Sequence, residues 1–209
     1  MTHLLILFLA TFGAAFLASA PPGLLNVNAA KTSVEKGKSN GVIFGIGVAV
    51  MVMLQTYISV RIAKYLSRHP EVVDGLMQFA IIVFAFLMVF FFVKARNTKV
   101  KGVIAEKGAK RNSFTKGLFL AAINILTIPY YSGLNSLFHA QGFMNYEVID
   151  EMVFILSAGT GTFLVMYLYV FYFNRKSSKR GRFAKNSNYI LSALMLVLLT
   201  ITLIRIACT

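Results

Sequence analysis

Six long apolar stretches without any Asp, Glu, Lys or Arg constrain this chain more than any other feature. Each is close to or above the ~17–25 residues that an α-helix needs to cross a ~30 Å hydrocarbon core. Helix is the expected state, because backbone polar groups in lipid must be satisfied internally and the alternation of a β-barrel strand is missing. We therefore predict an all-α integral membrane protein with six transmembrane helices. The stretches are Leu4–Ala20, Gly41–Val60, Gly75–Val93, Gly117–Phe138, Met152–Phe173 and Tyr189–Ile204.

The basic residues are concentrated in alternate links between these stretches. The links Pro21–Asn40, Lys94–Lys116 and Asn174–Asn188 hold 3, 8 and 6 of the 21 Lys and Arg residues, 17 in all. Cytoplasmic loops of membrane proteins carry an excess of Lys and Arg, so these three links are expected in the cytoplasm and both termini outside it. The net charge of +14 then reports orientation in a bacterial inner membrane next to anionic lipid. No nucleic-acid partner is expected.

The link Lys94–Lys116 divides the chain into two similar parts. We predict a first three-helix repeat over residues 1–93, a basic cytoplasmic linker over 94–116 and a second three-helix repeat over 117–209. Because each repeat has an odd number of helices, the two repeats are inverted relative to each other. Inverted repeats are typical of secondary transporters, whose substrate sites lie near the bilayer midplane at discontinuous helices.

Proline, glycine and amide residues interrupt the first helix of each repeat. Pro21-Pro22-Gly23 precedes two asparagines in the first repeat, and Asn124 precedes Pro129 in the second. Proline breaks a helix because it lacks a backbone donor and clashes with the preceding turn. The freed carbonyls and the new helix N-terminus can bind the ammonium and carboxylate of a zwitterion. The alternative is that Pro21–Gly23 only ends the first helix at the interface and that Pro129 is a tolerated kink.

Small residues and one amide mark the other helices. Gly41 and Gly45 form a small-xxx-small pair, and Gly159 and Gly161 repeat such a surface, so close helix packing is expected there. Gln55 is expected to form an interhelical hydrogen bond and is kept as a candidate ligand contact. The candidate substrate-binding residues are Pro21, Pro22, Gly23, Asn26, Asn28, Gln55, Asn124, Thr127 and Pro129.

In these motifs the chain resembles the lysine-exporter (LysE/RhtB) family of small amino-acid exporters. Those proteins have six helices and a Pro-Gly-Pro motif closing the first, followed by a basic stretch and a glycine-rich second helix. The resemblance implies amino-acid export. Pro-Pro-Gly replaces Pro-Gly-Pro here, and Val48–Met53 lacks the acid often found in the family's second helix, which argues against a proton relay and a strongly cationic substrate. The matching segments are Pro21–Asn26, Lys36–Lys38 and Gly41–Gly47, with Gly117, Asn124, Thr127 and Pro129 in the second half.

We accordingly expect a secondary transporter that exports small amino acids or similar metabolites by alternating access. The expected partners are a small-molecule substrate and the lipid bilayer, and a homo-oligomer is compatible with the sequence. Neither catalysis nor a cofactor is expected, because the three histidines are scattered and the apolar stretches contain no acid. A non-transporting membrane scaffold and a small membrane-embedded enzyme stay open as alternatives.

Overall fold

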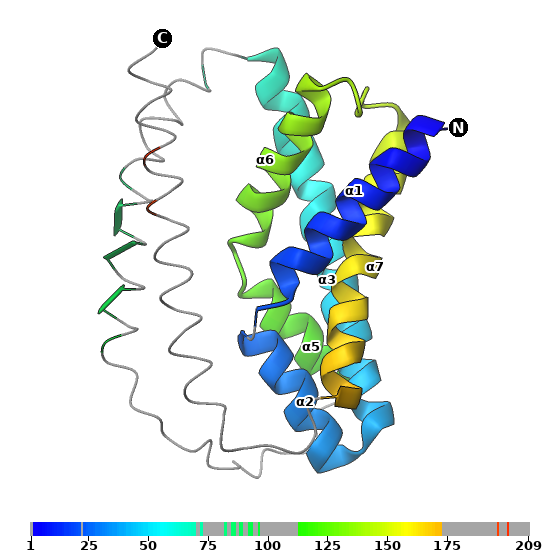
Figure 1. Ribbon diagram of the computed structural model, residues 1–209, viewed down its shortest axis with the longest axis vertical. Helices are drawn as coiled ribbons and strands as arrows, with labels where there is room; N and C mark the ends of the chain where they lie inside the picture. The colour runs from blue at the N-terminus through cyan, green and yellow to red at the C-terminus, as the bar shows by residue number, and fades with distance from the viewer. Residues whose placement is uncertain are drawn as a thin grey trace. The chain divides into compact units, whose positions relative to one another are not determined.

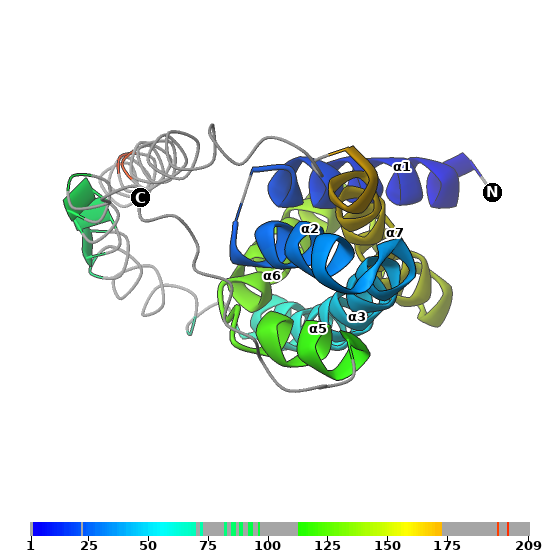
Figure 2. The ribbon, with the colours of Figure 1, turned by 90° about the horizontal axis from the view of Figure 1, so that it is seen from below.

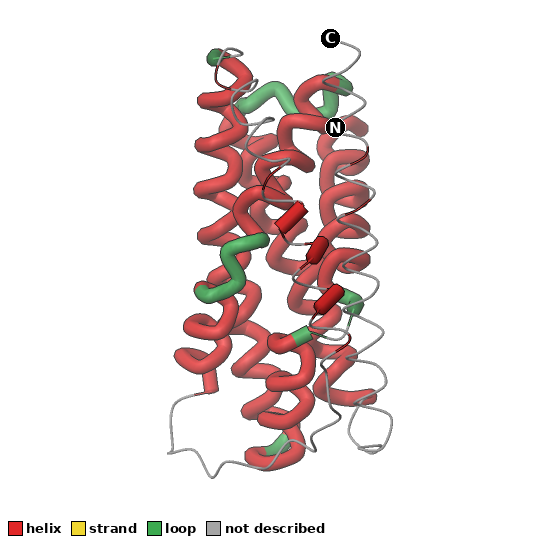
Figure 3. The backbone as a smooth tube through the Cα atoms, turned by 90° about the vertical axis from the view of Figure 1, so that its left-hand side faces the viewer, coloured by secondary structure: helices red, strands yellow, loops and turns green. Residues whose placement is uncertain are grey.

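The computed structural model describes residues 2–21, 23–69 and 113–172, with isolated positions between 72 and 96 and at 196 and 200. Within these residues the chain is helix and connecting loop, without a strand (Figure 3). The helices in this part are α1 (Thr2–Ser19), α2 (Leu24–Lys36), α3 (Lys38–Arg68), α5 (Ser113–Ala122), α6 (Thr127–Ala140) and α7 (Val148–Tyr172).

Three of these helices are long and apolar enough to cross a membrane. They are α1, α3 and α7, and α5 with α6 forms a fourth candidate if the bent pair is one span. These four correspond to the first, second, fifth and fourth predicted stretches. The third and sixth, Gly75–Val93 and Tyr189–Ile204, fall almost entirely outside the described residues and stay predictions. Four of the six expected spans therefore have a helical counterpart in the described part of the chain.

The chain divides into two compact units, each drawn from both halves of the sequence. One contains residues 1–67 and 107–175, and the other contains residues 68–106 and 176–209. In the first unit α1 and α2 descend in Figure 1, α3 ascends, α5 and α6 ascend, and α7 descends. The two interrupted helices, α1–α2 and α5–α6, therefore run in opposite directions. The predicted boundaries at residues 93 and 117 stay a prediction.

The glycines of α3 and α7 bring these helices into close contact, as their spacing predicts. A Cβ on Gly41 would lie 2.9 Å from Val170 Cγ2, and one on Gly45 would lie 3.0 Å from Met166 Cβ. On the other side of α7, a Cβ on Gly161 would lie 2.6 Å from the carbonyl oxygen of Phe12. Helix α7 thus packs between α1 and α3, as the end-on view also shows (Figure 2). The packing role of these glycines is confirmed.

Helices α3 and α5 meet through a reciprocal backbone contact. A Cβ on Gly47 would overlap the carbonyl oxygen of Phe114, and a Cβ on Gly117 would overlap the carbonyl oxygen of Phe44. Each glycine follows by three residues the phenylalanine whose carbonyl faces the other helix. Small residues permit this close approach of two membrane helices. The contact positions α5 against the lower half of α3.

The link predicted over Pro21–Asn40 is wrong in one respect, because most of it is helix α2. Four small or polar residues with the i, i+3, i+4, i+7 spacing of one helix face, Asn26, Ala29, Ala30 and Ser33, are buried. Helix α2 packs against α7 and α5 through tertiary contacts that its polar composition did not indicate. Gly37, with φ of 90°, then turns the chain directly into α3. Residues 113–116, at the end of the linker predicted over 94–116, form the first turn of α5.

Candidate functional site

The first helix break lies at Pro21–Gly23, as predicted. Helix α1 ends at Ser19, and α2 begins after Gly23, whose extended backbone (φ −114°, ψ −171°) forms the N-cap. The amide of Ala20 still donates to the carbonyl of Phe16 at 2.9 Å, so the α1 ladder ends immediately before the prolines. Pro21 and Gly23 are exposed, and Pro22 lies outside the described residues. The prolines end α1 because they supply no backbone donor.

Protein side chains bond the carbonyls that this break leaves without helical partners. The amide Nδ2 of Asn26 donates to the carbonyls of Ser19 and Pro21, both at 2.8 Å. The hydroxyl of Tyr169 donates to the carbonyl of Ala20 at 2.9 Å. Three successive carbonyls are thereby satisfied, which avoids the cost of unpaired acceptors in lipid. Asn26 is buried and acts here as a clamp on the backbone.

Asn28 does not join this group. Its amide donates to the carbonyl of Leu24 at 2.8 Å, one turn earlier in α2, and this hydrogen bond is exposed. The two asparagines are two residues apart and therefore point to different sides of the helix. Of the two candidate asparagines, Asn26 alone is placed at the break.

The second break separates α5 from α6, which are bent by 68° relative to each other. Residues 123–126 form the connection, so the interruption comes before Pro129. Pro129 is the third residue of α6, within the first turn, where a backbone donor has no helical partner in any case. Pro129 therefore begins the upper helix, and it is not a kink within a continuous one.

One side chain of α3 holds both sides of the second break. The Nε2 of Gln55 donates to the carbonyl of Ala121 at 3.2 Å and to that of Asn124 at 3.4 Å. These are the interhelical hydrogen bonds expected of Gln55. Its other amide atom, Oε1, is buried without a hydrogen-bond partner, and the residue is 5% exposed. A buried acceptor is thus available beside the discontinuity.

Further along α3, serines continue this contact. Ser59 Oγ donates to the carbonyl of Ile128 at 2.9 Å, and Ser132 Oγ donates to the carbonyl of Ser59 at 3.3 Å. Thr127 is buried at the start of α6. Asn124 contributes its carbonyl to the contact, whereas its residue as a whole is exposed. The structure thus brings together Gln55, Thr127 and the backbone of Asn124.

A hydrogen bond ties the end of α1 to α7. Ser19 Oγ donates to Thr162 Oγ1 at 3.3 Å. Tyr131, which is buried in α6, interacts with the same threonine. Thr162 lies halfway along the apolar stretch of α7, and Tyr131 lies one turn after Thr127 in α6. Sequence reasoning missed Thr162, Tyr131 and Tyr169. The available signal was a hydroxyl inside an apolar span, where a polar side chain needs a partner.

Two acids fall just before the predicted stretch Met152–Phe173 and yet belong to helix α7. Asp150 and Glu151 lie in the first turn of α7, where carboxylates complement the helix dipole, and both are buried. Asp150 accepts from the backbone amide of Asn145 at 2.9 Å and pairs with His3 Nε2 at 2.9 Å. The apolar run begins at residue 152, so hydropathy alone started this helix too late. The N-terminal end of α7 therefore carries two buried acids that lie outside the predicted stretch.

Comparison with known proteins supplies one match. The model of one protein family, described as LysE type translocator, matches residues 16–205. No curated protein and no solved structure matches the chain. Among the described residues, no group of three or more His, Cys, Asp and Glu side chains is arranged to hold a metal ion.

Proposed function

Because the chain belongs to the LysE type translocator family, we propose that it exports small, neutral amino acids or similar metabolites across the bacterial cytoplasmic membrane. The family match spans most of the chain and makes it a multi-pass membrane protein of a transporter family. The proposal goes further in naming a secondary exporter that works by alternating access. The bilayer and a small zwitterionic substrate are its partners.

The observation that carries this proposal is the unpartnered Oε1 of Gln55 beside the α5–α6 break. An unpaired polar atom buried in a membrane protein costs about 1–3 kcal/mol, so its retention needs a reason. A substrate ammonium can donate to this oxygen without burying a counter-charge. The neighbouring backbone of residues 121–128 is already fastened to α3 by Gln55 and Ser59, which preorganises the site. We assign Asn124, Thr127 and Pro129 to this site, in line with the sequence prediction.

The opposite directions of α1–α2 and α5–α6 support alternating access. In transporters built from inverted repeats, discontinuous helices from the two repeats flank one central site. Here Ser19, at the end of the first interrupted helix, donates to Thr162 of α7, and Tyr131 of the second interrupted helix interacts with the same threonine. We propose that Thr162 couples a substrate at the second break to the first, where Asn26 clamps the end of α1. We assign the basic links to the cytoplasm and the two termini to the outside on the charge distribution.

Export can be measured in cells that express the chain and are loaded with amino-acid dipeptides. Hydrolysis inside the cells raises the free amino acid, and its appearance in the medium reports efflux. We expect expression to accelerate the efflux of one or more small amino acids. Gln55→Met removes the free acceptor with little change in volume and should abolish this gain, and Asn124→Ala and Pro129→Ala should reduce it.

Asn28→Ala is the matched control, because among the described residues this amide bonds within α2, and the substitution should leave efflux unchanged. The proposal is abandoned if expression of the protein and all three variants leave the efflux of every amino acid unaltered. A scaffold would give that result and would still retain a binding partner. A membrane enzyme would instead convert its substrate in detergent solution.

A further inference from the structure

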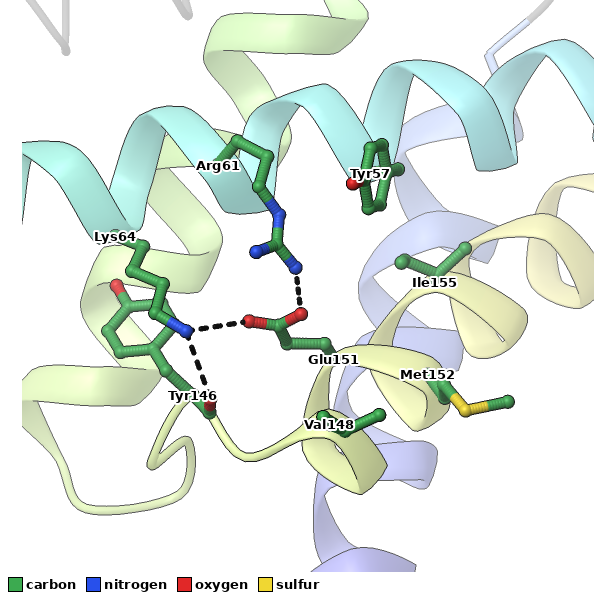
Figure 4. A pocket seen from close by; sticks show the side chains of 8 residues that line it. All are labelled: Tyr57, Arg61, Lys64, Tyr146, Val148, Glu151, Met152 and Ile155. Atoms are coloured by element: carbon green, nitrogen blue, oxygen red, sulfur yellow. Dashed lines mark hydrogen bonds and ion pairs between the residues drawn. The ribbon is translucent and has the colours of Figure 1, made fainter.

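A second polar group lies away from the helix breaks, at the end of the first unit where α3 ends and α7 begins. It lines a pocket of about 340 Å³ (Figure 4). This volume lies near the lower end of the ~300–1,000 Å³ typical of small-molecule sites. Helix α3 contributes Arg61 and Lys64, and α7 contributes Glu151. None of the residues predicted from the sequence as substrate ligands lines this pocket.

Two cations share a single carboxylate in this pocket. Arg61 pairs with Glu151 Oε2, and Lys64 Nζ lies 3.2 Å from Glu151 Oε1. Lys64 also donates to the carbonyl of Tyr146 at 3.3 Å. The Glu151 side chain is 9% exposed, whereas that of Arg61 is 44% exposed. The three charged groups therefore carry a net charge of +1, and the cation Arg61 is the most exposed of them.

The Arg61 guanidinium still has donors to offer. A guanidinium has five N–H donors in a planar fork, and in the described part of the chain Arg61 donates only to Glu151. The guanidinium also lies over the Tyr57 ring at 5.0 Å, and Lys64 Nζ lies 5.7 Å from the Tyr146 ring. These contacts hold both cations at the pocket without neutralising them. The remaining donors match the geometry of a carboxylate.

The opposite wall of the pocket is apolar. Val148, Met152 and Ile155 project from successive turns of α7 beside the charged group (Figure 4). Burial raises the pKa of the Tyr146 hydroxyl above its usual value of 10, so this ring adds no negative charge at neutral pH. A ligand that fits both walls carries one anionic group on a small apolar body.

We propose that this pocket binds the exported amino acid through its carboxylate, which Arg61 and Lys64 hold while the side chain packs against Met152 and Ile155. The inference rests on the proposed function and adds to the central site a second substrate-binding site, located where α3 ends and α7 begins. Glu151 holds the two cations in place between ligands and faces the substrate ammonium when the site is filled. A small, apolar, zwitterionic amino acid is thus the substrate class that both sites accept.

The test is equilibrium binding to the purified full-length protein in lipid nanodiscs, measured by isothermal titration calorimetry. The probes are L-leucine, leucinamide, which lacks the carboxylate, and 4-methylpentanoate, which lacks the ammonium. L-leucine and 4-methylpentanoate should bind and leucinamide should not. Arg61→Gln should weaken L-leucine binding about ten- to a hundredfold, the range for losing a hydrogen bond to a charged group, and Lys64→Gln should act in the same direction.

Lys38→Gln is the matched control, because it removes the same charge from the other end of α3, where Lys38 lies 5.0 Å from the Phe171 ring. Its affinity for L-leucine should equal that of the wild type. Equal binding of all three probes, or no saturable binding of L-leucine and L-alanine, overturns the proposal. The proposal is also overturned if the Arg61→Gln protein melts at lower temperature but binds L-leucine with unchanged affinity. The ion pair would then stabilise the fold without contributing to binding. Absence of efflux from wild-type cells would refute the proposed function while these titrations still decide the pocket.

Discussion

The reciprocal contact between α3 and α5 predicts that a single methyl group at Gly47 will separate these helices. The Cβ of an alanine would overlap the carbonyl oxygen of Phe114 and would lie 3.1 Å from the amide nitrogen of Leu118. Both obstacles are backbone atoms, so no side-chain rotation relieves the overlap. Ordinary van der Waals separation requires α5 to move away by about 1 Å. Gly47→Ala is therefore a strong test of this part of the fold.

The size of the destabilisation by Gly47→Ala follows from two opposing contributions to the free energy of unfolding. Overpacking of a tight contact costs about 1–3 kcal/mol, and stretching the Gln55 hydrogen bonds of 3.2 and 3.4 Å to Ala121 and Asn124 costs about 1 kcal/mol more. Replacing a glycine within a helix by alanine stabilises the helix by about 0.5–1 kcal/mol. The net loss is about 1–3.5 kcal/mol in the free energy of unfolding. For a chain of this size it lowers the melting temperature by about 2–14 °C.

Gly133→Ala in α6 is the control, because a Cβ at that position meets nothing within 4 Å. It should raise the melting temperature slightly through the same gain in helix propensity. Thermal melts of the purified protein in detergent, followed by circular dichroism, compare the two variants directly. A Gly47→Ala protein as stable as Gly133→Ala would refute the assigned closeness of the two helices.

Three other substitutions test the polar contacts. Asn26→Ala leaves the carbonyls of Ser19 and Pro21 unpaired and should cost about 2–4 kcal/mol, whereas Asn28→Ala should cost less than 1 kcal/mol; equal losses in denaturant titrations would remove the clamp assigned to Asn26. Tyr169→Phe deletes the hydroxyl that donates to the Ala20 carbonyl and should cost about 1–2 kcal/mol in the same titrations, and a neutral result would contradict that hydrogen bond. Asp150→Asn keeps the volume but loses the charged acceptor for the Asn145 amide, so we expect a loss of about 1–3 kcal/mol; an unchanged melting temperature would show that the carboxylate does not hold this turn.

Hydropathy was sufficient to locate the candidate spans α1, α3 and α7 and the bent pair α5–α6 in the described part of the chain, because burial in lipid depends on composition along a single segment. The same approach missed α2, whose helix is stabilised by packing against α7 and α5 and has only modest apolar content. It also began α7 after Asp150 and Glu151, because a hydropathy pattern assigns charges to loops. Their partners, His3 and Arg61, lie 147 and 90 residues away in the sequence.

In the candidate site, too, local sequence predicted features that depend on a single segment but not those that depend on distant residues. Pro21 and Gly23 marked the first break correctly, since they act on their own backbone, whereas the second break lies at residues 123–126, before Pro129. The groups that satisfy each break come from distant helices, and the sequence offers no local sign of them. Gln55 reaches Ala121 across 66 residues, and Tyr169 reaches Ala20 across 149. Asn124 looked like a side-chain ligand and contributes its carbonyl, which residue type alone does not distinguish.

The hydrogen bonds of α1 have a consequence for the order of assembly. In the described part of the chain, the side chains that tie α1 and the residue after it to other spans belong to α6 and α7, through Tyr130, Asp150, Thr162 and Tyr169. These residues lie more than a hundred positions after α1 in the chain. Helix α1 therefore enters the bilayer before α6 and α7 and must wait as an apolar helix without them, because contacts of such long sequence separation form late. Asn26 can already bond the carbonyls of Ser19 and Pro21, whereas the carbonyl of Ala20 gains the Tyr169 hydroxyl only when α7 arrives.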